Sequence, residues 1–335
     1  MRIIKLLIRK IIGEKLFESI SLFKLLIINT YIDAMMFFKH SMVFKQNTFN
    51  KIESKIILHY HGIEKGFLHE KFRYRFGEKG IIGLIELLKN KEVIENQKRT
   101  QILAAYMAIC KYYEKHQKEG IDISDYYSSN DYVFFKSLLT IDFDIVKEHN
   151  HTEFFEHSKS DFFEFSKSRG SVRNFTGELV SFETINKVIQ IAKTAPSVCN
   201  RQTIKVYYAE KKEIISRILS LQQGLKGYSD DINQLLIVVS DRNYFYTVGE
   251  RNQLYIDGGV FLMNLLYALH YYKIGACPAH WGFNYQQDRE IQKELGLSDS
   301  EKVICLVPIG IPKNEFKTTL SIRRDNEEIL KIVNS

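Results

Sequence analysis

Short apolar runs and longer apolar stretches at helical spacing alternate through the second half of the chain. Runs typical of buried strands occupy residues 205–210, 234–240 and 302–309, and a further strand is expected to begin at 275–278. Apolar positions at helical spacing predict helices between Ser181 and Pro196 and over residues 213–222, 251–272 and 291–295. This alternation predicts a sheet with helices packed against it.

The stretch over residues 251–272 is apolar on nearly every face, which is typical of a helix buried in a core or in an oligomer interface. Gly258 and Gly259 lie inside it. Two glycines in a helix interior cost about 2 kcal/mol relative to alanine. We therefore expect this helix to approach a neighbouring helix closely at the glycines.

The first half of the chain is expected to be mainly helical, because no proline precedes Pro196. A helical stripe covers residues 95–120, and further helix is expected within 132–149. The polar residues 150–160 are the candidate linker. We therefore expect a mainly helical N-terminal region at residues 1–156 and an α/β region at residues 157–335.

Residues 1–45 are apolar and basic. A signal peptide is not expected, since charged residues interrupt the apolar run and no small-residue cleavage site follows. A membrane-spanning helix is not expected either, because the best window, residues 22–38, contains Lys24 and Asp33 and falls short of about 20 residues. Two alternatives remain. The favoured one is amphipathic helices packed on the protein itself, and the other is a basic helix resting on an anionic membrane surface.

The composition of the chain excludes only a few classes of function. The chain has 335 residues with 45% apolar side chains and a net charge of +7, and it carries no recognisable nucleic-acid-binding signature. The four cysteines form no Cys-x-x-Cys pair, which favours reduced thiols in a cytoplasmic protein. His59 and His61 flank Tyr60, but a glycine-bounded helix end is the favoured explanation, so we expect no metal site.

The first chemical candidate is the segment that precedes the helix at Ser181. Arg169, Ser171 and Arg173 alternate, so in an extended backbone their side chains leave one face together. Two guanidinium groups with a hydroxyl between them suit a phosphate or another planar anion. The alternative is a basic surface segment beside an ordinary helix.

The order Arg-x-Ser-x-Arg-x-Phe, an amphipathic helix and then Ala-Pro-Ser-x-x-Asn-x-Gln resembles the opening of the nitroreductase family of FMN-dependent oxidoreductases. The resemblance implies an α+β fold, in which a mixed sheet is flanked by helices. It also implies an intimate homodimer with FMN at the interface. Here that domain would follow the mainly helical N-terminal region.

The resemblance assigns cofactor contacts to residues along the whole second half of the chain. The FMN phosphate would be bound by Arg169, Ser171, Arg323 and Arg324. Arg173 would approach the pyrimidine edge of the flavin, and Gly282 would present its N–H to flavin N5. A loop from the partner subunit would contribute Pro196, Ser197 and Asn200.

Two positions depart from the family pattern. Thr203-Ile204 stands where the family often has Pro-Trp, and Trp281 stands where several members have an acid. We expect Trp281 to be a pocket wall or a core residue. The neighbouring His280 is expected to be structural, with proton donation as the alternative. No catalytic side chain is expected.

The reaction implied by the resemblance is ping-pong hydride transfer from NADH or NADPH through FMN to an electron-poor small molecule. Residues 59–67 resemble a region upstream of the nitroreductase domain in bacterial proteins of surface-polysaccharide gene sets, which implies a role in that metabolism. Two alternatives stay open: a catalytically silent scaffold at the membrane, and a flavin-dependent dehydrogenase of a specific metabolite. The expected location is the cytoplasm, with peripheral contact to the inner face of the membrane through residues 1–45.

Overall fold

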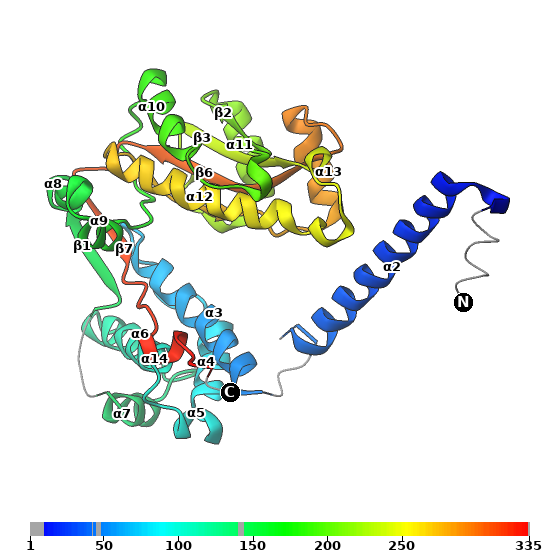
Figure 1. Ribbon diagram of the computed structural model, residues 1–335. Coiled ribbons are helices and arrows are strands. Elements are labelled where there is room, and N and C mark those ends of the chain that lie inside the picture. Colours follow the sequence, from blue (N-terminus) through cyan, green and yellow to red (C-terminus); the bar gives the residue numbers. More distant parts are fainter. Residues whose placement is uncertain (1–9, 42, 45–47, 140–143, 334–335) are drawn as a thin grey trace.

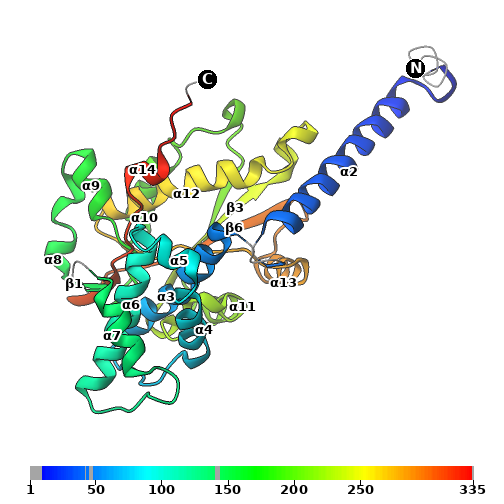
Figure 2. The same ribbon diagram turned by 90° about the horizontal axis from the view of Figure 1, so that it is seen from below.

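The computed structural model describes residues 10–41, 43–44, 48–139 and 144–333. Figure 1 shows a mainly helical N-terminal region beside an α/β domain, with one long helix, α2, projecting from the body. Figure 2 shows the same projection of α2 from a second direction.

The C-terminal domain is built on a five-stranded sheet. The strands β2 (Ile204–Ala209), β3 (Gln234–Asp241), β6 (Glu301–Gly310) and β4 (Gly275–Ala276) lie in that order, and β5 (Ala279–His280) also pairs with β6. The described pairs in this sheet are all antiparallel. The α+β class is confirmed, although the resemblance implies a mixed sheet.

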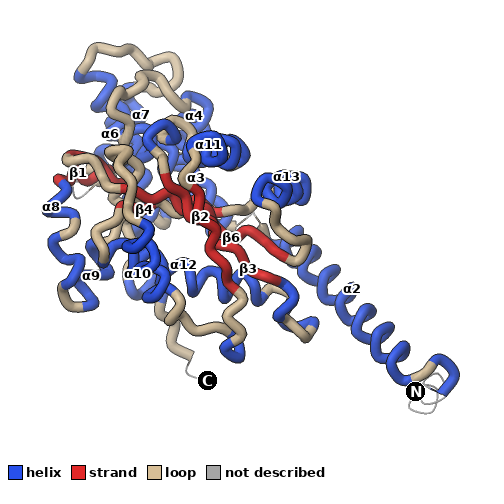
Figure 3. The backbone as a smooth tube through the Cα atoms, turned by 90° about the horizontal axis from the view of Figure 1, so that it is seen from above, coloured by secondary structure: helices blue, strands red, loops and turns tan. Residues whose placement is uncertain are grey.

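Helices cover both faces of this sheet, as Figure 3 shows from above. One face carries α10 (Phe182–Ala192) and α12 (Gln253–Tyr271), and the other carries α11 (Lys212–Leu221) and α13 (Tyr285–Leu295). The side chains of strand β3 alternate between the two faces of the sheet. Because helices cover both faces, the strand is buried along its whole length. Leu236 packs toward α12, whereas Leu235 and Ile237 pack toward α11.

The helices that the apolar pattern predicts in this domain are confirmed, but the expected contact at the glycines of α12 is corrected. A Cβ at Gly258 would lie 3.0 Å from two side-chain carbons of Ile304 on β6, whereas one at Gly259 would meet nothing within 4 Å. The close approach at the glycines is therefore between a helix and a strand, and only Gly258 takes part in it.

The N-terminal region has a core of its own. Its helices are α3 (Phe49–Phe67), α4 (Glu78–Leu88), α5 (Lys91–Glu95), α6 (Thr100–Lys118) and α7 (Ser129–Ser137). Helix α6 confirms the prediction for residues 95–120 and supplies much of this core, including the fully buried Tyr106 and Tyr112. The helix expected within residues 132–149 is wrong in its second half, where strand β1 (Val146–Asn150) lies.

Strand β1 ties the two regions together. It pairs antiparallel with β7 (Glu315–Thr319), so that Lys147 lies opposite Thr318. After β7 the chain returns to the N-terminal region, where Gln101 Nε2 donates to the carbonyl of Ile322 at 3.1 Å and the tail ends in α14 (Asn326–Ile329). The N-terminal region and the C-terminal domain thus share a two-stranded sheet.

The segment expected to be a polar linker is folded. It contains α8 (His151–Phe154) and the turn η1 (Glu156–Lys159), and it leads into α9 (Phe162–Ser168). Phe154 and Phe155 are buried in the core of the C-terminal domain. The expected boundary between residues 156 and 157 falls within η1. The other 3-10 turns are η2 (Val198–Asn200), η3 (Gln223–Leu225), η4 (Ser229–Asp231), η5 (Arg242–Tyr244) and η6 (Val248–Glu250).

Helix α2 (Glu14–His40) bears on two expectations for the N-terminus. It has no buried residue, so the favoured packing of this segment on the protein itself is wrong. It has 27 residues and is long and apolar enough, by length and composition, to cross a membrane. Arg251, just before α12, binds Asp33 of α2 through two contacts of 2.7 and 2.9 Å. The first nine residues of the chain lie outside the described residues.

Candidate functional site

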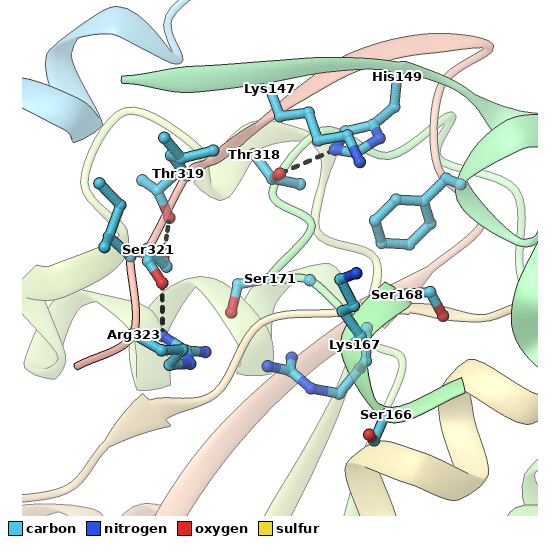
Figure 4. Close-up of a pocket in the computed structure, with 15 residues that line it drawn as sticks. Lys147, His149, Ser166, Lys167, Ser168, Ser171, Thr318, Thr319, Ser321 and Arg323 are labelled. Atoms are coloured by element: carbon cyan, nitrogen blue, oxygen red, sulfur yellow. Dashed lines mark hydrogen bonds between the residues drawn. The ribbon is translucent and has the colours of Figure 1, made fainter. Parts of the chain in front are cut away.

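A cavity of about 590 Å³ opens between the β1–β7 pair and the segment that follows α9. Figure 4 shows its lining residues, which come from β1 and α8, from α9 and the segment after it, and from β7 and the tail that follows it. Gly170 brings the segment close to the β1–β7 side, because a Cβ there would lie 3.2 Å from Phe154 and 3.4 Å from Thr318. The site is therefore assembled from residues far apart in the sequence.

The cavity is strongly positive. Four cations line it, namely Lys147, Lys167, Arg169 and Arg323, and its fifteen lining residues include no aspartate or glutamate. Burial, followed by the charge of Arg323, lowers the pKa of the Arg169 guanidinium. Arg169 is half-buried and Arg323 is exposed, so an anion in the cavity would gain a charge-assisted contact from each guanidinium group. The cavity is thus an anion site by its charge.

Hydroxyl groups complete the lining. The cavity is lined by Ser166, Ser168, Ser171, Thr318, Thr319 and Ser321. Two of these hydroxyls are held by histidines, since Ser168 Oγ lies 2.7 Å from His270 Nε2 and Thr318 Oγ1 lies 2.9 Å from His149 Nε2. Both contacts put a hydrogen-bonding side chain at a fixed place on the wall.

Both histidines are neutral at pH 7. Burial, followed by the charge of Lys147, lowers the pKa of His149 to about 4. Burial, followed by the charge of Arg169, lowers the pKa of His270 to about 4. They therefore act as neutral hydrogen-bonding partners and add no positive charge to the cavity.

Three of the expected phosphate-binding residues, Arg169, Ser171 and Arg323, line this cavity together. Arg324 does not. Its guanidinium binds Glu53 at 2.7 Å and Glu328 at 2.8 Å, away from the cavity. Consecutive side chains of an extended segment point to opposite sides, so the tail places Arg323 in the cavity and turns Arg324 toward α3.

Arg173 lines a second cavity of about 420 Å³, together with His69 and Tyr228. The expectation that Arg169, Ser171 and Arg173 leave one face together therefore fails at Arg173. The physical reason is local, since Val172 and Phe175 are both buried and the segment does not follow the strict alternation of a strand. The Nε of Arg173 is buried and has no hydrogen-bond partner among the described residues.

A lysine from α3 lies next to Arg173. Burial, followed by the charge of Arg173, lowers the pKa of Lys65. Lys65 Nζ donates to the carbonyl of Gly224 at 2.8 Å. Gly224 N donates to the Gln222 side chain at 2.8 Å, and Gln222 Nε2 donates to the carbonyl of His280 at 3.3 Å. This chain of contacts leads from α3 to the turn at Gly282.

Gly282 is exposed directly after β5, and the neighbouring Trp281 is buried. The indole Nε1 of Trp281 donates to Asp288 Oδ1 at 2.8 Å. The interpretation of Trp281 as a core or wall residue is confirmed by this burial. The backbone N–H of Gly282 remains the candidate group here.

The loop at residues 196–202 lies outside both cavities, so Pro196, Ser197 and Asn200 do not join the other site residues within one chain. Asn200, Cys199 and Gln202 all have positive φ, between 49° and 55°. Ser197 Oγ accepts from the N–H of Gln202 at 2.9 Å and stabilises the turn. Non-glycine residues in the left-handed region are strained, and such strain concentrates at functional sites.

Lys147, His149 and Lys65 were missed by the sequence analysis. Strand β1 has no alternating apolar pattern, and its partner β7 lies about 170 residues later in the chain. Lys65 stands in the unusual segment at residues 59–67, which was the one available signal. Among the described residues no group of three or more His, Cys, Asp or Glu side chains could hold a metal ion.

Comparison with known protein families matches residues 167–225 and 220–311 to the model of the nitroreductase family. Residues 167–311 form a nitroreductase-like oxidoreductase domain. The match covers less than half of the chain and contains Arg169, Ser171, Arg173, the loop at 196–202 and Gly282. It excludes the N-terminal region, β7 and Arg323.

Solved structures include several similar folds. A putative NADH oxidase from Clostridium acetobutylicum is 20% identical, with 51% of this chain and 99% of that chain covered and a TM-score of 0.45. An FMN-dependent nitroreductase from Clostridium difficile is 18% identical, with 51% and 98% covered and a TM-score of 0.44. No curated protein matches the sequence.

Proposed function

We propose that this protein is an FMN-dependent oxidoreductase that uses NADH or NADPH to reduce an electron-poor small molecule. The observation that carries the proposal is the positive cavity. It gathers four cations without an acid among its lining residues, and these include Lys167 and Arg169 at the start of the part of the chain that matches the nitroreductase family.

The residues of the cavity fit a phosphate group. A phosphate monoester carries nearly two negative charges and three strong acceptor oxygens at pH 7. Arg169 and Arg323 supply guanidinium donors, and Ser171 supplies a hydroxyl beside them. Binding the phosphate would relieve the repulsion between the guanidinium groups. The cavity volume of about 590 Å³ lies within the range of small-molecule sites.

The chemistry that FMN supplies when bound is two-electron transfer, in which it takes a hydride from NAD(P)H and passes two electrons and a proton to the acceptor. The residues of the chain itself would bind the cofactor and adjust its reduction potential. The second cavity is lined by both signs of charge, with Lys71, Arg173 and Lys313 beside Glu70, Asp230 and Asp231. Arg173 forms no ion pair among the described residues, so its charge would favour electron uptake by a flavin bound there. The Gly282 N–H is exposed and free to donate to a ligand.

We infer that two copies of the chain form the functional unit. Helix α12 exposes the apolar side chains Tyr255, Ile256 and Val260, whose exposed fractions are 48%, 57% and 40%. The strained loop with Pro196, Ser197 and Asn200 lines neither of the two cavities of its own chain, so its contact with a cofactor would be made in the site of a partner. Light scattering of the purified protein tests this, and a monomer at micromolar concentration would contradict it.

The N-terminal helix supports a peripheral membrane contact. Helix α2 has no buried residue and exposes many large apolar side chains, and it has basic residues near both ends, Lys15 and Lys39 among them. We place this contact on the inner face of the membrane through residues 1–45. The resemblance of residues 59–67 to proteins of surface-polysaccharide gene sets supports a role in that metabolism.

The test of the proposed activity is the absorbance spectrum of the FMN-loaded protein before and after NADPH or NADH is added. Bleaching of the flavin band, followed by its recovery when an electron-poor acceptor is added, is the expected result. A flavin that neither nucleotide reduces would favour the silent scaffold. A flavin reduced only by another metabolite would favour the dehydrogenase.

A further inference from the structure

Two segments of the N-terminal region reach the candidate cofactor site, although both lie before the residues that match the nitroreductase family. Strand β1 forms one wall of the phosphate cavity, and the end of α3 lies beside Arg173. Neither segment belongs to the domain that the comparison identifies.

We propose, on the basis of the proposed function, that the N-terminal region completes the cofactor site of its own chain. In this arrangement Lys147 of β1 binds the FMN phosphate. Lys65 of α3 lies with Arg173 at the flavin end and makes the bound flavin easier to reduce.

The register of the β1–β7 pair points Lys147 into the cavity. Lys147 lies opposite Thr318, and both line the cavity, so the two side chains share one face of the ladder. The next pair, Glu148 and Lys317, lies on the other face and forms an ion pair at 2.9 Å. Lys147 has no ion pair among the described residues, and Figure 4 shows it beside His149 on the cavity side.

His149 fixes β1 against this wall. Its Nε2 lies 2.9 Å from Thr318 Oγ1, and its ring packs on Phe316 and Phe154 with centroid distances of 5.5 and 4.9 Å. These three contacts of His149 fix the strand that carries Lys147, which lines the same cavity as Arg169. The lysine is exposed at the rim, so its ammonium group can reach an anion that enters the cavity.

The end of α3 is fixed in the same way at the other cavity. Tyr228 Oη donates to the carbonyl of Lys65 at 2.8 Å, and the ring of His69 stacks on Tyr228 with a centroid distance of 4.5 Å. Lys65 Nζ in turn holds the carbonyl of Gly224. Neither Lys65 nor Arg173 forms an ion pair among the described residues, and both are half-buried. Glu70, Asp230 and Asp231 also line the cavity of Arg173, but Glu70 and Asp231 pair with Lys313. A group that gains negative charge there is stabilised.

The phosphate end is tested by titrating the full-length protein, freed of flavin, with FMN and with riboflavin, which lacks the phosphate. We expect Lys147→Met to weaken FMN binding about tenfold and to leave riboflavin binding unchanged. Lys147→Arg should restore most of the loss. Lys317→Met is the matched control, because it removes a lysine from the opposite face of the same ladder.

The flavin end is tested by the reduction potential of the bound flavin. We expect Lys65→Met to shift the potential to a more negative value than in the wild type, because a positive charge that favours electron uptake is lost. Lys55→Met, on the same helix ten residues earlier, should leave the potential unchanged. The unfolding temperature of each variant shows whether α3 remains folded.

These outcomes separate the inference from the proposed function. If the wild-type protein binds neither FMN nor riboflavin, the proposed function fails and the inference fails with it. If the wild type binds FMN, but Lys147→Met keeps its affinity and Lys65→Met keeps its potential, the N-terminal region is not part of the site and the proposed function stands. Equal losses of FMN and riboflavin binding in Lys147→Met would also overturn the phosphate contact.

Discussion

Arg169 is the residue on which the site depends most. Its guanidinium is half-buried near Arg323 and has no acid partner among the described residues. We expect Arg169→Met to weaken FMN binding about a hundredfold, because a buried charge-assisted contact to the phosphate is lost. The same change should raise the unfolding temperature of the flavin-free protein, since a half-buried charge without an acid partner is removed. Fluorescence titration and thermal unfolding check both parts.

Arg324, which the sequence also assigned to the phosphate, should affect stability rather than FMN binding. Arg324 pairs with the buried Glu53 and with Glu328, and it does not reach the cavity. We expect Arg324→Met to lower the free energy of unfolding by about 2 kcal/mol, because Glu53 keeps only the Arg99 contact at 3.0 Å. FMN affinity should stay within twofold of the wild type, and a hundredfold loss would show that Arg324 binds the phosphate after all.

The histidines of the cavity predict a pH dependence. The pKa of His270 lies at about 4 in the folded protein, against about 6.5 in an unfolded chain, because of burial and the charge of Arg169. The unfolded state therefore binds more protons between these values, and stability falls as the pH falls from about 6.5 to 4. His270, packed among Phe154, Phe155 and Phe165, contributes up to about 3 kcal/mol to this loss. Denaturant unfolding at pH 7 and pH 5 should show a smaller difference in His270→Gln than in the wild type, and equal differences would contradict the assignment.

From the sequence, the role of a site residue could be predicted only where that residue belongs to a local motif. The motif around Arg169 and Ser171 led to the phosphate cavity, and the basic pair near the C-terminus led to Arg323. Arg324 was indistinguishable from Arg323 in the sequence, because the side to which each points depends on how the tail crosses α3. Lys147 was missed because nothing in its own strand indicates a cavity.

At the scale of elements, the glycines of α12 offer a paired test. Gly258→Ala places a Cβ 3.0 Å from two carbons of Ile304, whereas Gly259→Ala meets open space. We expect Gly259→Ala to raise the free energy of unfolding by up to about 1 kcal/mol through helix propensity. Gly258→Ala should be about 1–2 kcal/mol less stable than Gly259→Ala, because Ile304 must move. Chemical denaturation of the two variants measures the difference, and equal stabilities would contradict the helix–strand contact.

Helices and strands could be predicted from the sequence where burial gives their apolar residues a regular spacing. Strands β3 and β6 are almost wholly buried, so their apolar runs were visible, and Ser181 capped α10 as expected by accepting from Thr184 N at 3.2 Å. Strand β1 escaped notice because its residues are half-buried or exposed and its stability depends on β7. A short polar strand that pairs with a distant segment has no pattern in its own sequence that would indicate the pairing.

At the scale of the whole molecule, α2 is the helix that projects from the body, which it contacts through the ion pair of Asp33 with Arg251. Its 27 residues span about 40 Å, and no residue along them is buried. We expect the full-length protein to float with vesicles that contain anionic lipid. Replacing Phe23 and Ile27 together by Asp should abolish flotation without changing FMN binding, since both side chains are exposed.

The matched control for α2 is Val133→Asp, which adds a charge at an exposed apolar position of α7. It should float as the wild type does. Flotation of the Phe23/Ile27 variant at the wild-type level would show that α2 does not mediate membrane contact. Because Arg251 binds Asp33, the helix would hold the domain close to the membrane surface rather than on a free tether.

The arrangement of the whole molecule also explains why the two expected regions are not separate in the structure. Strand β1 comes from the N-terminal region and β7 from the end of the chain, and their ladder forms a wall of the cavity. The tail then packs on α3 and α6 through Arg324 and Ile322. A cofactor in this cavity would be held by both regions at once.

The most direct test of the central claim is the flavin content of the purified full-length protein after incubation with excess FMN and removal of free ligand. We expect one FMN per chain in the wild type and almost none in Arg169→Met, with the absorbance band of a protein-bound flavin. A wild-type protein that retains no FMN, or an Arg169→Met variant that retains as much as the wild type, would contradict the assignment of the positive cavity to the FMN phosphate.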